Sequence, residues 1–554
     1  MVKKQGNGEI MPTITYDKKD LLNLIGKRLS DEQLEEIIHL MKTNVESKTE
    51  TEITVELTPD RPDLFGIEGL SRAIKQYLGL QKGLKKFTVN SPQLHIKASY
   101  LPYRPYLAAS VIRNVSITDS FIRSLMNIQD VLTDTIGRKR EKVAIGIHDF
   151  DKIIPNIVYT EVSSDEKIVP LDTNEEITLA EVLEKIPKGK EYGHILSGLK
   201  KLPAWIDAKG IFSFPPIINS ERTRVTEKTK NLFVELTGTD KEAVLQTLNI
   251  IVTNFAERGC IIEATKIFYG EKSEVVPNLN PTFIDLGIDE TNKLIGLDLK
   301  KSDIIDALNR MGYDVIENKG MLKVFIPAYR TDILHKVDLI EDVAIGYGFN
   351  NFIPHLPSVA TIGKVHPIEK LSNKVRQLLV GFGFQEIIRP ILTNHKNLFD
   401  KMNIKSEAVI ELENPVSSEY ICLRNWLLPS LMEVLSANKH VEYPQNIFEV
   451  GDVVVPDNDE ETMSKTIRKV ACVISHSKSS YAEVKGVVES LLKQMGVIYS
   501  FKENSSETFI EGRQASIVVN NKSIGILGEI SPVVLEQWNL EMPCAAFEIS
   551  LDAI

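Results

Sequence analysis

Residues 326–348 read IPAYRTDILHKVDLIEDVAIGYG and contain the pattern from which the organisation of the chain is best inferred. Apolar residues and acids recur there at helical spacing, so we expect a helix over the second half of the stretch. Thr331 and Asp332 are residue types that cap the start of a helix, while Gly346 and Gly348 are typical of its end. At about 100° per residue, one face collects three acids, Asp338, Glu341 and Asp342. The opposite face is apolar and contains Val337, Leu339, Ile340, Val343 and Ala344.

Asp332 adds a fourth acid, which reaches this face only from the turn before the helix. Carboxylates that are brought together repel one another unless a cation lies between them, and a set of oxygen ligands favours a hard ion such as Mg²⁺ or Ca²⁺. The alternative is a solvated helix start, because the helix dipole alone favours acids in the first turns. The pattern by itself leaves both interpretations open.

The composition is that of a soluble, multidomain protein of a reducing compartment. The 554 residues predict three to five domains, and no apolar run is long enough for a membrane span. The first ten residues have no apolar signal-peptide core. The four cysteines are widely spaced without a CxxC pair, so we expect a cytoplasmic location and no zinc site of the cysteine type. The net charge of −11 does not favour general nucleic-acid binding, although local basic runs such as residues 137–142 exist.

An N-terminal α/β domain is expected over residues 1–84. A strand at residues 52–57 leads into a turn with two prolines, and a helix follows that Asp63 is placed to cap. Residues 59–73 read PDRPDLFGIEGLSRA and resemble the N-R-P-D-L-x-x-x-E-G-x-A-R signature of the phenylalanine–tRNA ligase beta subunit. Asp60 and Ser71 depart from that signature, where the family often has Asn and Ala.

Residues 85–268 are expected to form an α+β domain, with one strand over residues 104–112 and another over 231–237. Alternation along the second strand directs Glu235 and Thr237 to the same side. The strand ends at a capped joint before a helix, which is an ordinary structural feature and also a suitable mouth for a small pocket.

Three motifs of this domain are similar to the editing domain of the archaeal and cytosolic branch of that family: residues 137–149, 214–220 and 233–240. The resemblance implies hydrolysis of tyrosine wrongly attached to the phenylalanine tRNA, by positioned water without a side-chain nucleophile. The residues at the matching positions are Leu202, Ser213, Glu235 and Thr237. Glu235 stands where the family often has Asp, which moves the carboxylate by one methylene.

Residues 269–352 are expected to form a winged-helix-like module. The stretch from Pro327 to Ala344 matches the magnesium-carrying module of the family, where the ligand positions correspond to Asp332, Asp338, Glu341 and Asp342. The resemblance therefore implies a Mg²⁺ ion with a structural or interface role.

Residues 353–554 are expected to form an antiparallel sheet with helices, similar to the catalytic module of class II tRNA ligases. A helix over residues 366–382 and a strand over 384–393 with Pro390 resemble the dimer-forming first motif of that class. The arginine of its F-R-x-E motif is replaced by Glu449, and no G-x-G-x-x-R motif follows. Since a carboxylate repels triphosphate, we expect a module without adenylation chemistry.

The family resemblance covers the chain from about residue 10 onward. It implies an α₂β₂ heterotetramer that binds the phenylalanine tRNA, with ATP-dependent adenylation on the alpha subunit and editing on this chain. Two other functions stay open: a free-standing tRNA-editing hydrolase, and a tRNA- or protein-binding scaffold without chemistry.

Overall fold

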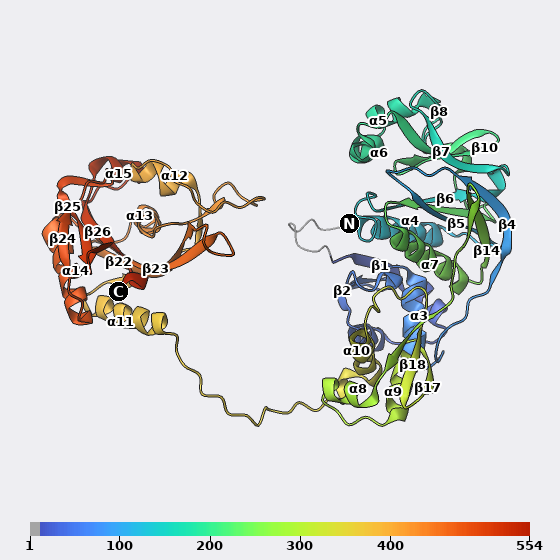
Figure 1. The fold of residues 1–554 in the computed structure, drawn as a ribbon, viewed down its shortest axis with the longest axis horizontal. Helices are drawn as coiled ribbons and strands as arrows, with labels where there is room; N and C mark the ends of the chain where they lie inside the picture. Colours follow the sequence, from blue (N-terminus) through green and yellow to red (C-terminus); the bar gives the residue numbers. More distant parts are fainter. Residues whose placement is uncertain (1–10) are drawn as a thin grey trace. The chain divides into compact units, whose positions relative to one another are not determined.

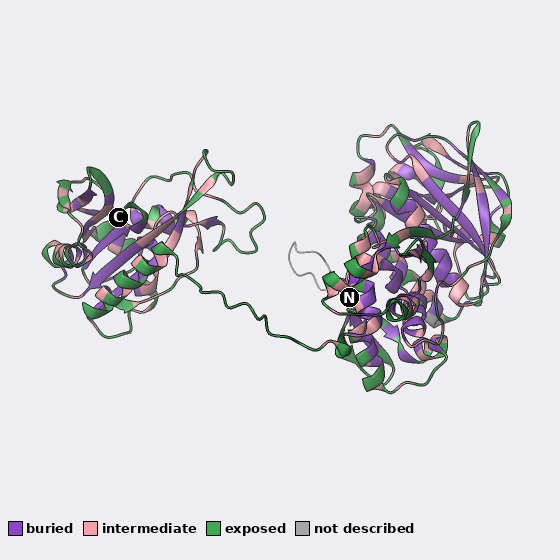
Figure 2. Ribbon diagram, turned by 60° about the horizontal axis from the view of Figure 1, so that its bottom comes forward, coloured by how far each residue is buried: buried purple, intermediate pink, exposed green. Residues whose placement is uncertain are grey.

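The computed structural model describes residues 11–554, so the expectation about a signal segment in residues 1–10 lies outside the described part. The chain forms two compact units, Met1–His355 and Leu356–Ile554 (Figure 1). In the described residues, no helix is long and apolar enough to cross a membrane. Each unit is built from mixed α/β layers whose strands are mostly buried (Figure 2).

The first unit begins with a small antiparallel sheet in the order β1-β3-β2 and three helices. The elements are β1 Thr13–Asp17, α1 Lys18–Ile25, α2 Asp31–Leu40, β2 Asn44–Lys48, β3 Glu52–Glu56, the 3-10 turn η1 Pro62–Leu64, and α3 Ile67–Tyr77. The prediction that Asp63 caps α3 was wrong. Asp63 lies within η1 and accepts a hydrogen bond from Arg61 Nε at 2.8 Å, while α3 starts after Gly66.

A ten-stranded sheet dominates the first unit and carries the candidate site. Its order is β12-β11-β10-β7-β4-β14-β5-β13-β6, with β15 paired to β14. The strands are β4 Val89–Ala98, β5 Tyr106–Arg113, β6 Val143–Asp149, β7 Ile157–Ser163, β10 Lys201–Asp207, β11 Gly210–Phe214, β12 Ile218–Asn219, β13 Leu232–Gly238, β14 Ile261–Tyr269 and β15 Lys272–Val276. The strand expected at residue 104 begins at Tyr106, so Arg104 lies in the preceding turn.

Helices cover this sheet and help to bury β13, all seven residues of which are buried. Helix α7 Lys241–Glu257 packs on β5 and β13, and α4 Asp119–Asp134 contacts β6. A small insert between β7 and β10 contains β8 Lys167–Ile168, β9 Ile177–Thr178, α5 Leu179–Lys185 and α6 Pro187–Tyr192. Since β13 is paired with β5 on one side and β6 on the other, its backbone is fixed along its whole length, and with it the points from which its polar side chains project.

The last part of the first unit is a three-stranded antiparallel sheet with three helices. The elements are β16 Thr282–Leu286, α8 Ile288–Ile295, α9 Lys301–Arg310, β17 Asp314–Asn318, β18 Met321–Ile326 and α10 Lys336–Tyr347. The helix expected in residues 326–348 is present, but its predicted N-cap was wrong, because His335 and not Thr331 or Asp332 precedes it. Gly348 ends the helix at φ 97°, whereas Gly346 lies inside it, where a Cβ would stand 2.2 Å from the Ala307 carbonyl oxygen. Val337, expected on the buried face, is 45% exposed.

The second unit is a seven-stranded sheet in the order β19-β22-β23-β27-β26-β25-β24 with helices on both faces. Its strands are β19 Gln385–Glu386, β22 Gln445–Pro456, β23 Ser464–Ser475, β24 Ser500–Glu503, β25 Phe509–Val519, β26 Lys522–Ile530 and β27 Cys544–Ser550, and a separate pair is β20 Leu392–Thr393 with β21 Cys422–Leu423. Its helices are α11 Pro367–Gly381, α12 His395–Leu398, α13 Leu428–Ala437, α14 Tyr481–Met495 and α15 Pro532–Gln537. All pairings in the large sheet are antiparallel except β19 with β22.

Two apolar cores occupy the two faces of this sheet. Helices α11 and α14 pack with Phe448 and Val450, whereas α13 and α15 pack with Ile447 and Ala471. The single strand predicted over residues 384–393 is divided between two sheets, and Pro390, which has no amide hydrogen to donate, lies between the two parts.

Candidate functional site

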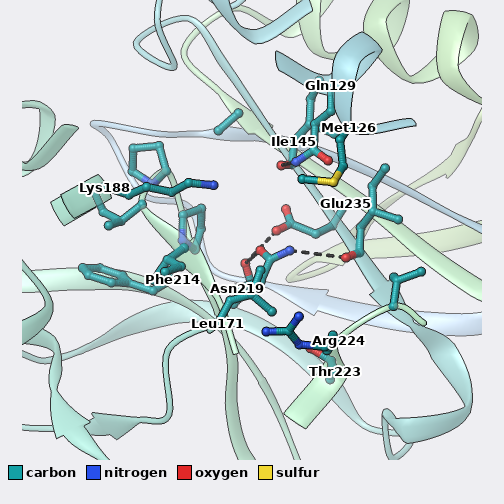
Figure 3. A pocket seen from close by; sticks show the side chains of 18 of the residues that line it. Met126, Gln129, Ile145, Leu171, Lys188, Phe214, Asn219, Thr223, Arg224 and Glu235 are labelled. Atoms are coloured by element: carbon teal, nitrogen blue, oxygen red, sulfur yellow. Dashed lines mark hydrogen bonds between the residues drawn. The ribbon is translucent and has the colours of Figure 1, made fainter. Parts of the chain in front are cut away.

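A cavity of about 290 Å³ lies beside β13, between helix α4 and the end of the ten-stranded sheet (Figure 3). One side is formed by α4 and the strand β6, and the other by residues 213–219 of β11, β12 and their connection. The side chains that line it include Met126, Gln129, Ile145, Phe214, Asn219 and Glu235. The lining combines apolar side chains with polar and charged ones, so the cavity can hold a ligand that has both an apolar body and hydrogen-bonding groups.

Three acids line this cavity, and Glu235 is the buried one, at 2% exposed, whereas Asp130 and Asp172 are exposed. Ser213 Oγ donates a hydrogen bond to Glu235 Oε1 at 2.8 Å. Within the described residues, Glu235 Oε2 has no hydrogen-bond partner. Because an unpaired buried carboxylate oxygen is costly, this atom is prepared to accept a hydrogen bond from a ligand.

Two neighbours of Glu235 were not predicted. Gly146 lies opposite it on β6, where a Cβ would stand 2.2 Å from Glu235 Oε1, so the glycine leaves room for the longer acid. His148, with no exposed surface, is hydrogen-bonded through Nδ1 to Thr223 Oγ1 at 2.8 Å and places Nε2 3.8 Å from Glu235 Oε1. Gly146 could have been identified from the sequence, because a glycine inside an apolar strand often marks the close approach of another group.

The other two predicted editing residues lie outside the cavity lining. Leu202 is buried on β10 in a separate apolar cluster with the insert. Thr237 Oγ1 accepts a hydrogen bond from Arg104 Nε at 2.8 Å. The structure thus brings Ser213 and Glu235 together at the cavity, whereas Leu202 and Thr237 support surrounding elements.

Charged side chains of both signs surround the cavity mouth. Arg224 is paired with Glu221 at 2.7 Å and also with Asp172. Burial, and next the charge of Arg140, lower the pKa of Lys188. The mouth therefore has cationic groups without being uniformly positive.

The four acids of the first stretch have protein partners in this structure. Arg330 Nη2 lies 2.7 Å from Asp332 Oδ2 and 2.6 Å from Asp342 Oδ2, and Tyr313 also bonds Asp342. Asp338 Oδ2 accepts from the backbone amides of residues 334 and 335, and Glu341 pairs with Lys42 at 2.8 Å.

Arg330 thus occupies the position of a cation between two of these acids. Burial would raise the pKa of Asp332, but Arg330 holds it below its ordinary value, whereas burial raises the pKa of Asp342. Across residues 11–554, no group of three or more His, Cys, Asp or Glu side chains is arranged to hold a metal. The side chains as placed do not fit a single four-acid cage, and Mg²⁺ stays a prediction.

Glu449, which replaces the expected arginine in the second unit, is engaged in a buried ion pair. Arg424 Nη2 lies 2.6 Å from Glu449 Oε1, and both side chains are 3% exposed. Gly451 permits this contact, because a Cβ there would stand 2.6 Å from Arg424 Nη2. An arginine is present near the sheet, but its charge is directed to a carboxylate of the same chain.

Comparisons with known proteins agree with this organisation. Family sequence models match the B3/4 domain at residues 106–261, the tRNA synthetase B5 domain at 284–349, and the phenylalanyl tRNA synthetase beta chain CLM domain at 353–551. The chain is 40% identical over 550 residues to the phenylalanine–tRNA ligase beta subunit of Pyrococcus abyssi, covering 98% of this chain and 99% of the relative. The same subunit of Methanocaldococcus jannaschii is 41% identical over 551 residues, with 98% and 100% covered.

The chain belongs to the phenylalanine–tRNA ligase beta subunit family. A crystal structure of an N-terminal fragment of the Pyrococcus horikoshii phenylalanyl-tRNA synthetase beta subunit aligns with a TM-score of 0.59 and 37% identity, covering 61% of this chain and 99% of the fragment. The predicted membership is confirmed, together with the mixed α/β, multidomain fold.

Within this chain, the cavity lies inside the B3/4 match and the acidic helix α10 inside the B5 match. The Arg424–Glu449 pair lies inside the match to the CLM domain. The cavity acid, the acidic helix and Glu449, which the sequence had singled out, therefore each lie in a different domain of the family.

Proposed function

We propose that the chain acts as the beta subunit of a phenylalanine–tRNA ligase, in an α₂β₂ assembly that attaches phenylalanine to its tRNA in an ATP-dependent reaction. We further propose that its B3/4 cavity hydrolyses tyrosyl-tRNA formed in error. The names of the relatives support the first part. The observation that carries the second is the buried, unpaired Oε2 atom of Glu235 at the cavity beside Ser213.

Glu235 supplies the discrimination. The phenol hydroxyl of a bound tyrosyl group donates a hydrogen bond to Oε2, whereas a phenylalanyl group leaves that buried carboxylate oxygen unpaired. A site built around one substrate hydroxyl rejects the analogue that lacks it strongly, by as much as about 10⁴–10⁵-fold where the polar group is left fully buried. Ser213 holds the carboxylate in place by donating to Oε1.

Hydrolysis in this cavity proceeds without a side-chain nucleophile. The hydroxyl hydrogen of Ser213 is directed to Glu235, the acid that we propose recognises the phenol hydroxyl, and His148 Nε2 lies 3.8 Å from that same carboxylate. Ser213 thus acts as a donor to the recognition acid in this proposal. Water, positioned at the ester carbonyl and assisted by the free ribose hydroxyl of the tRNA terminus, is then the nucleophile.

We assign adenylation to the alpha subunit because Arg424, the candidate phosphate-binding cation of this chain, is neutralised by Glu449. Phosphoryl chemistry needs cationic groups directed at the phosphates. Arg424 is held by Glu449 at 2.6 Å in a buried pair. The second unit therefore serves as a scaffold for the alpha subunit and the tRNA. A cytoplasmic location and a Mg²⁺ ion in the B5 module are proposed with the assembly.

The test is deacylation of purified tyrosyl-tRNA by the full chain, with and without the alpha subunit. Glu235→Gln is expected to lower kcat/KM for tyrosyl-tRNA by about 10–100-fold, the effect of losing a hydrogen bond to a charged group. Glu227→Gln, an exposed acid of the same domain, is the matched control.

The outcome also separates the alternatives. Hydrolysis by this chain alone at the full rate supports a free-standing hydrolase, whereas no hydrolysis in either state leaves a scaffold without chemistry. Phenylalanine charging by the reconstituted pair tests the ligase assignment independently.

A further inference from the structure

Arg104 is a buried arginine whose contacts lead to the cavity wall, although it does not line the cavity. It is 1% exposed and lies in the turn before β5. Its Nε donates to Thr237 Oγ1 at 2.8 Å and its Nη2 donates to the Thr237 carbonyl oxygen at 2.8 Å. Thr237 is two residues from Glu235 on the same strand, so this side of the guanidinium is attached to the strand that carries the cavity acid.

The other side of the guanidinium holds a turn of unusual conformation. Nη1 and Nη2 of Arg104 each donate to the Arg140 carbonyl oxygen at 3.1 Å. Arg138, Lys139 and Arg140 have φ values of 45°, 52° and 71°, three consecutive residues with side chains in the left-handed region. That conformation is unfavourable for a residue with a Cβ, so the turn needs contacts that hold it.

This left-handed turn places Arg140 on the wall of the cavity. Arg140 Nη1 donates to the carbonyl oxygens of Pro216 and Ile217 at 2.9 and 2.7 Å, and its guanidinium lies 4.2 Å from the ring centroid of Tyr192. Arg140, Pro216 and Ile217 all line the cavity. A continuous set of contacts therefore runs from β13 through Arg104 to the turn, and from the turn to the opposite wall.

We propose that Arg104 is a positioning residue of the cavity, which fixes the left-handed turn Arg138–Arg140 and thereby holds the wall at residues 216–217 opposite Glu235. This inference rests on the proposed editing activity and adds a residue that does not touch the substrate. The hydrogen bonds of the buried guanidinium go to a hydroxyl and to backbone carbonyl oxygens. Burial lowers the pKa of Arg104, and the charge of Glu235 opposes that shift without an ion pair between the two side chains. A buried cation held mainly by neutral acceptors is expensive to retain, which favours a specific role over simple core packing.

The experiment compares Arg104→Lys with the unchanged full chain in deacylation of tyrosyl-tRNA. Lysine keeps the charge but lacks the planar fork that contacts Thr237 and Arg140 together. We expect kcat to fall by about 10²-fold, the effect of a small misplacement of an active-site wall, while KM for the tRNA stays within about twofold. The matched control is Arg113→Lys, which alters an arginine of the same sheet paired with Glu263 at 3.0 Å.

Two further measurements distinguish positioning from general support of the fold. Trypsin is expected to cut the exposed turn at Arg138 and Lys139 faster in Arg104→Lys than in the unchanged chain. Lys139→Gly, added to Arg104→Lys, removes the left-handed penalty at an exposed position and is expected to recover part of the lost kcat. If the lysine variant does not fold, Lys139→Val in the otherwise unchanged chain disfavours the same turn and should reproduce the fall in kcat.

A kcat for Arg104→Lys within twofold of the unchanged chain would overturn the inference. A loss that Lys139→Gly does not reduce would also overturn it, because Arg104 would then only support the fold. Absence of hydrolysis by the unchanged chain would instead defeat the proposed editing function and the role of Arg104 in it, and the trypsin comparison would show separately whether Arg104 holds the turn.

Discussion

Glu257 is the acid whose removal should most clearly destabilise the first unit. Its side chain has no exposed surface at the end of α7, and it faces three cations: Lys85 at 2.7 Å, Lys75 at 3.1 Å and Arg72 at 3.6 Å. Arg72 also stacks on Tyr329, 3.8 Å from the ring centroid. The carboxylate thus joins the N-terminal helix α3 and the following linker to the domain that carries the cavity.

Glu257→Gln keeps the size of the side chain and removes the charge. Each ion pair is worth about 5 kcal/mol at an effective dielectric constant of 20, and desolvation of the buried groups cancels much of the sum. Breaking a buried pair by neutralising one partner costs about 3–5 kcal/mol, because the remaining charges stay buried without compensation. We therefore expect the free energy of unfolding of the first unit to fall by about 3 kcal/mol at neutral pH.

Urea denaturation followed by tryptophan fluorescence measures this loss. The three tryptophans are Trp205, buried in the first unit, and Trp426 and Trp538 in the second. With the latter two replaced by Phe, the signal reports the first unit alone, and linear extrapolation gives its free energy of unfolding. Glu242→Gln, an exposed acid on the first turn of the same helix, is the control and should change the free energy by less than about 0.5 kcal/mol.

The pH dependence gives a second check with a defined sign. Burial would raise the pKa of Glu257, but Arg72, Lys85 and Lys75 hold it below its ordinary value. An acid with a lowered pKa in the folded state binds fewer protons there than in the unfolded chain. Its stabilisation is complete above the unfolded pKa of about 4.3 and is lost as the pH falls through the folded pKa. A destabilisation below about 1 kcal/mol at neutral pH, or one that persists unchanged at acidic pH, would refute the reasoning.

Three further predictions concern other parts of the molecule. Burial raises the pKa of Cys260 to about 11, so on the order of one thiol in a thousand is ionised at pH 8, and alkylation should be much slower in the native chain than in urea. Glu449→Arg places a second cation beside Arg424, so thermal unfolding should show a loss of at least about 3 kcal/mol, and ATP–pyrophosphate exchange by this chain should stay absent. If the B5 module holds Mg²⁺, metal analysis after dialysis should find the ion, and EDTA should lower the Tm of the chain. Asp338→Asn should abolish both effects. Equal metal content in the Asp338→Asn variant and the unchanged chain would count against the site.

The sequence was most informative where one physical signal determined the element. Helix α11 was predicted from its amphipathic pattern to within one residue at either end. The existence of helix α10 was predicted from its periodicity, and its end from Gly348, but it begins only at Lys336. The capping residue of α10 was missed, because Thr331 and Asp332 are good caps in isolation and Arg330 binds the latter instead. Asp332 is thus engaged by the buried side chain of Arg330 and is not available as a cap. No local sequence pattern predicts where the side chain of Arg330 points.

The cavity was predictable only in part for the same reason. Alternation along β13 placed Glu235 correctly, and the resemblance supplied Ser213, which lies on another strand. Thr237 shares the face of Glu235 but is occupied by Arg104, which is 133 residues away in sequence. Contacts between residues so far apart in sequence depend on the order of the strands in the sheet. That order cannot be predicted from any single segment of the sequence.

A comparison of the buried acids supports the proposal that Glu235 is the recognition acid. Glu449 also has an oxygen without a hydrogen bond, yet its other oxygen lies 2.6 Å from the Arg424 guanidinium, which compensates its charge. Asp342 is compensated by Arg330 in the same way. Glu235 has a hydroxyl at 2.8 Å and a histidine at 3.8 Å, and its free oxygen belongs to a residue that lines a cavity. An incompletely compensated acid beside an open space is stabilised by a ligand that donates a hydrogen bond, and this is the physical basis for placing recognition there and not at the acidic helix.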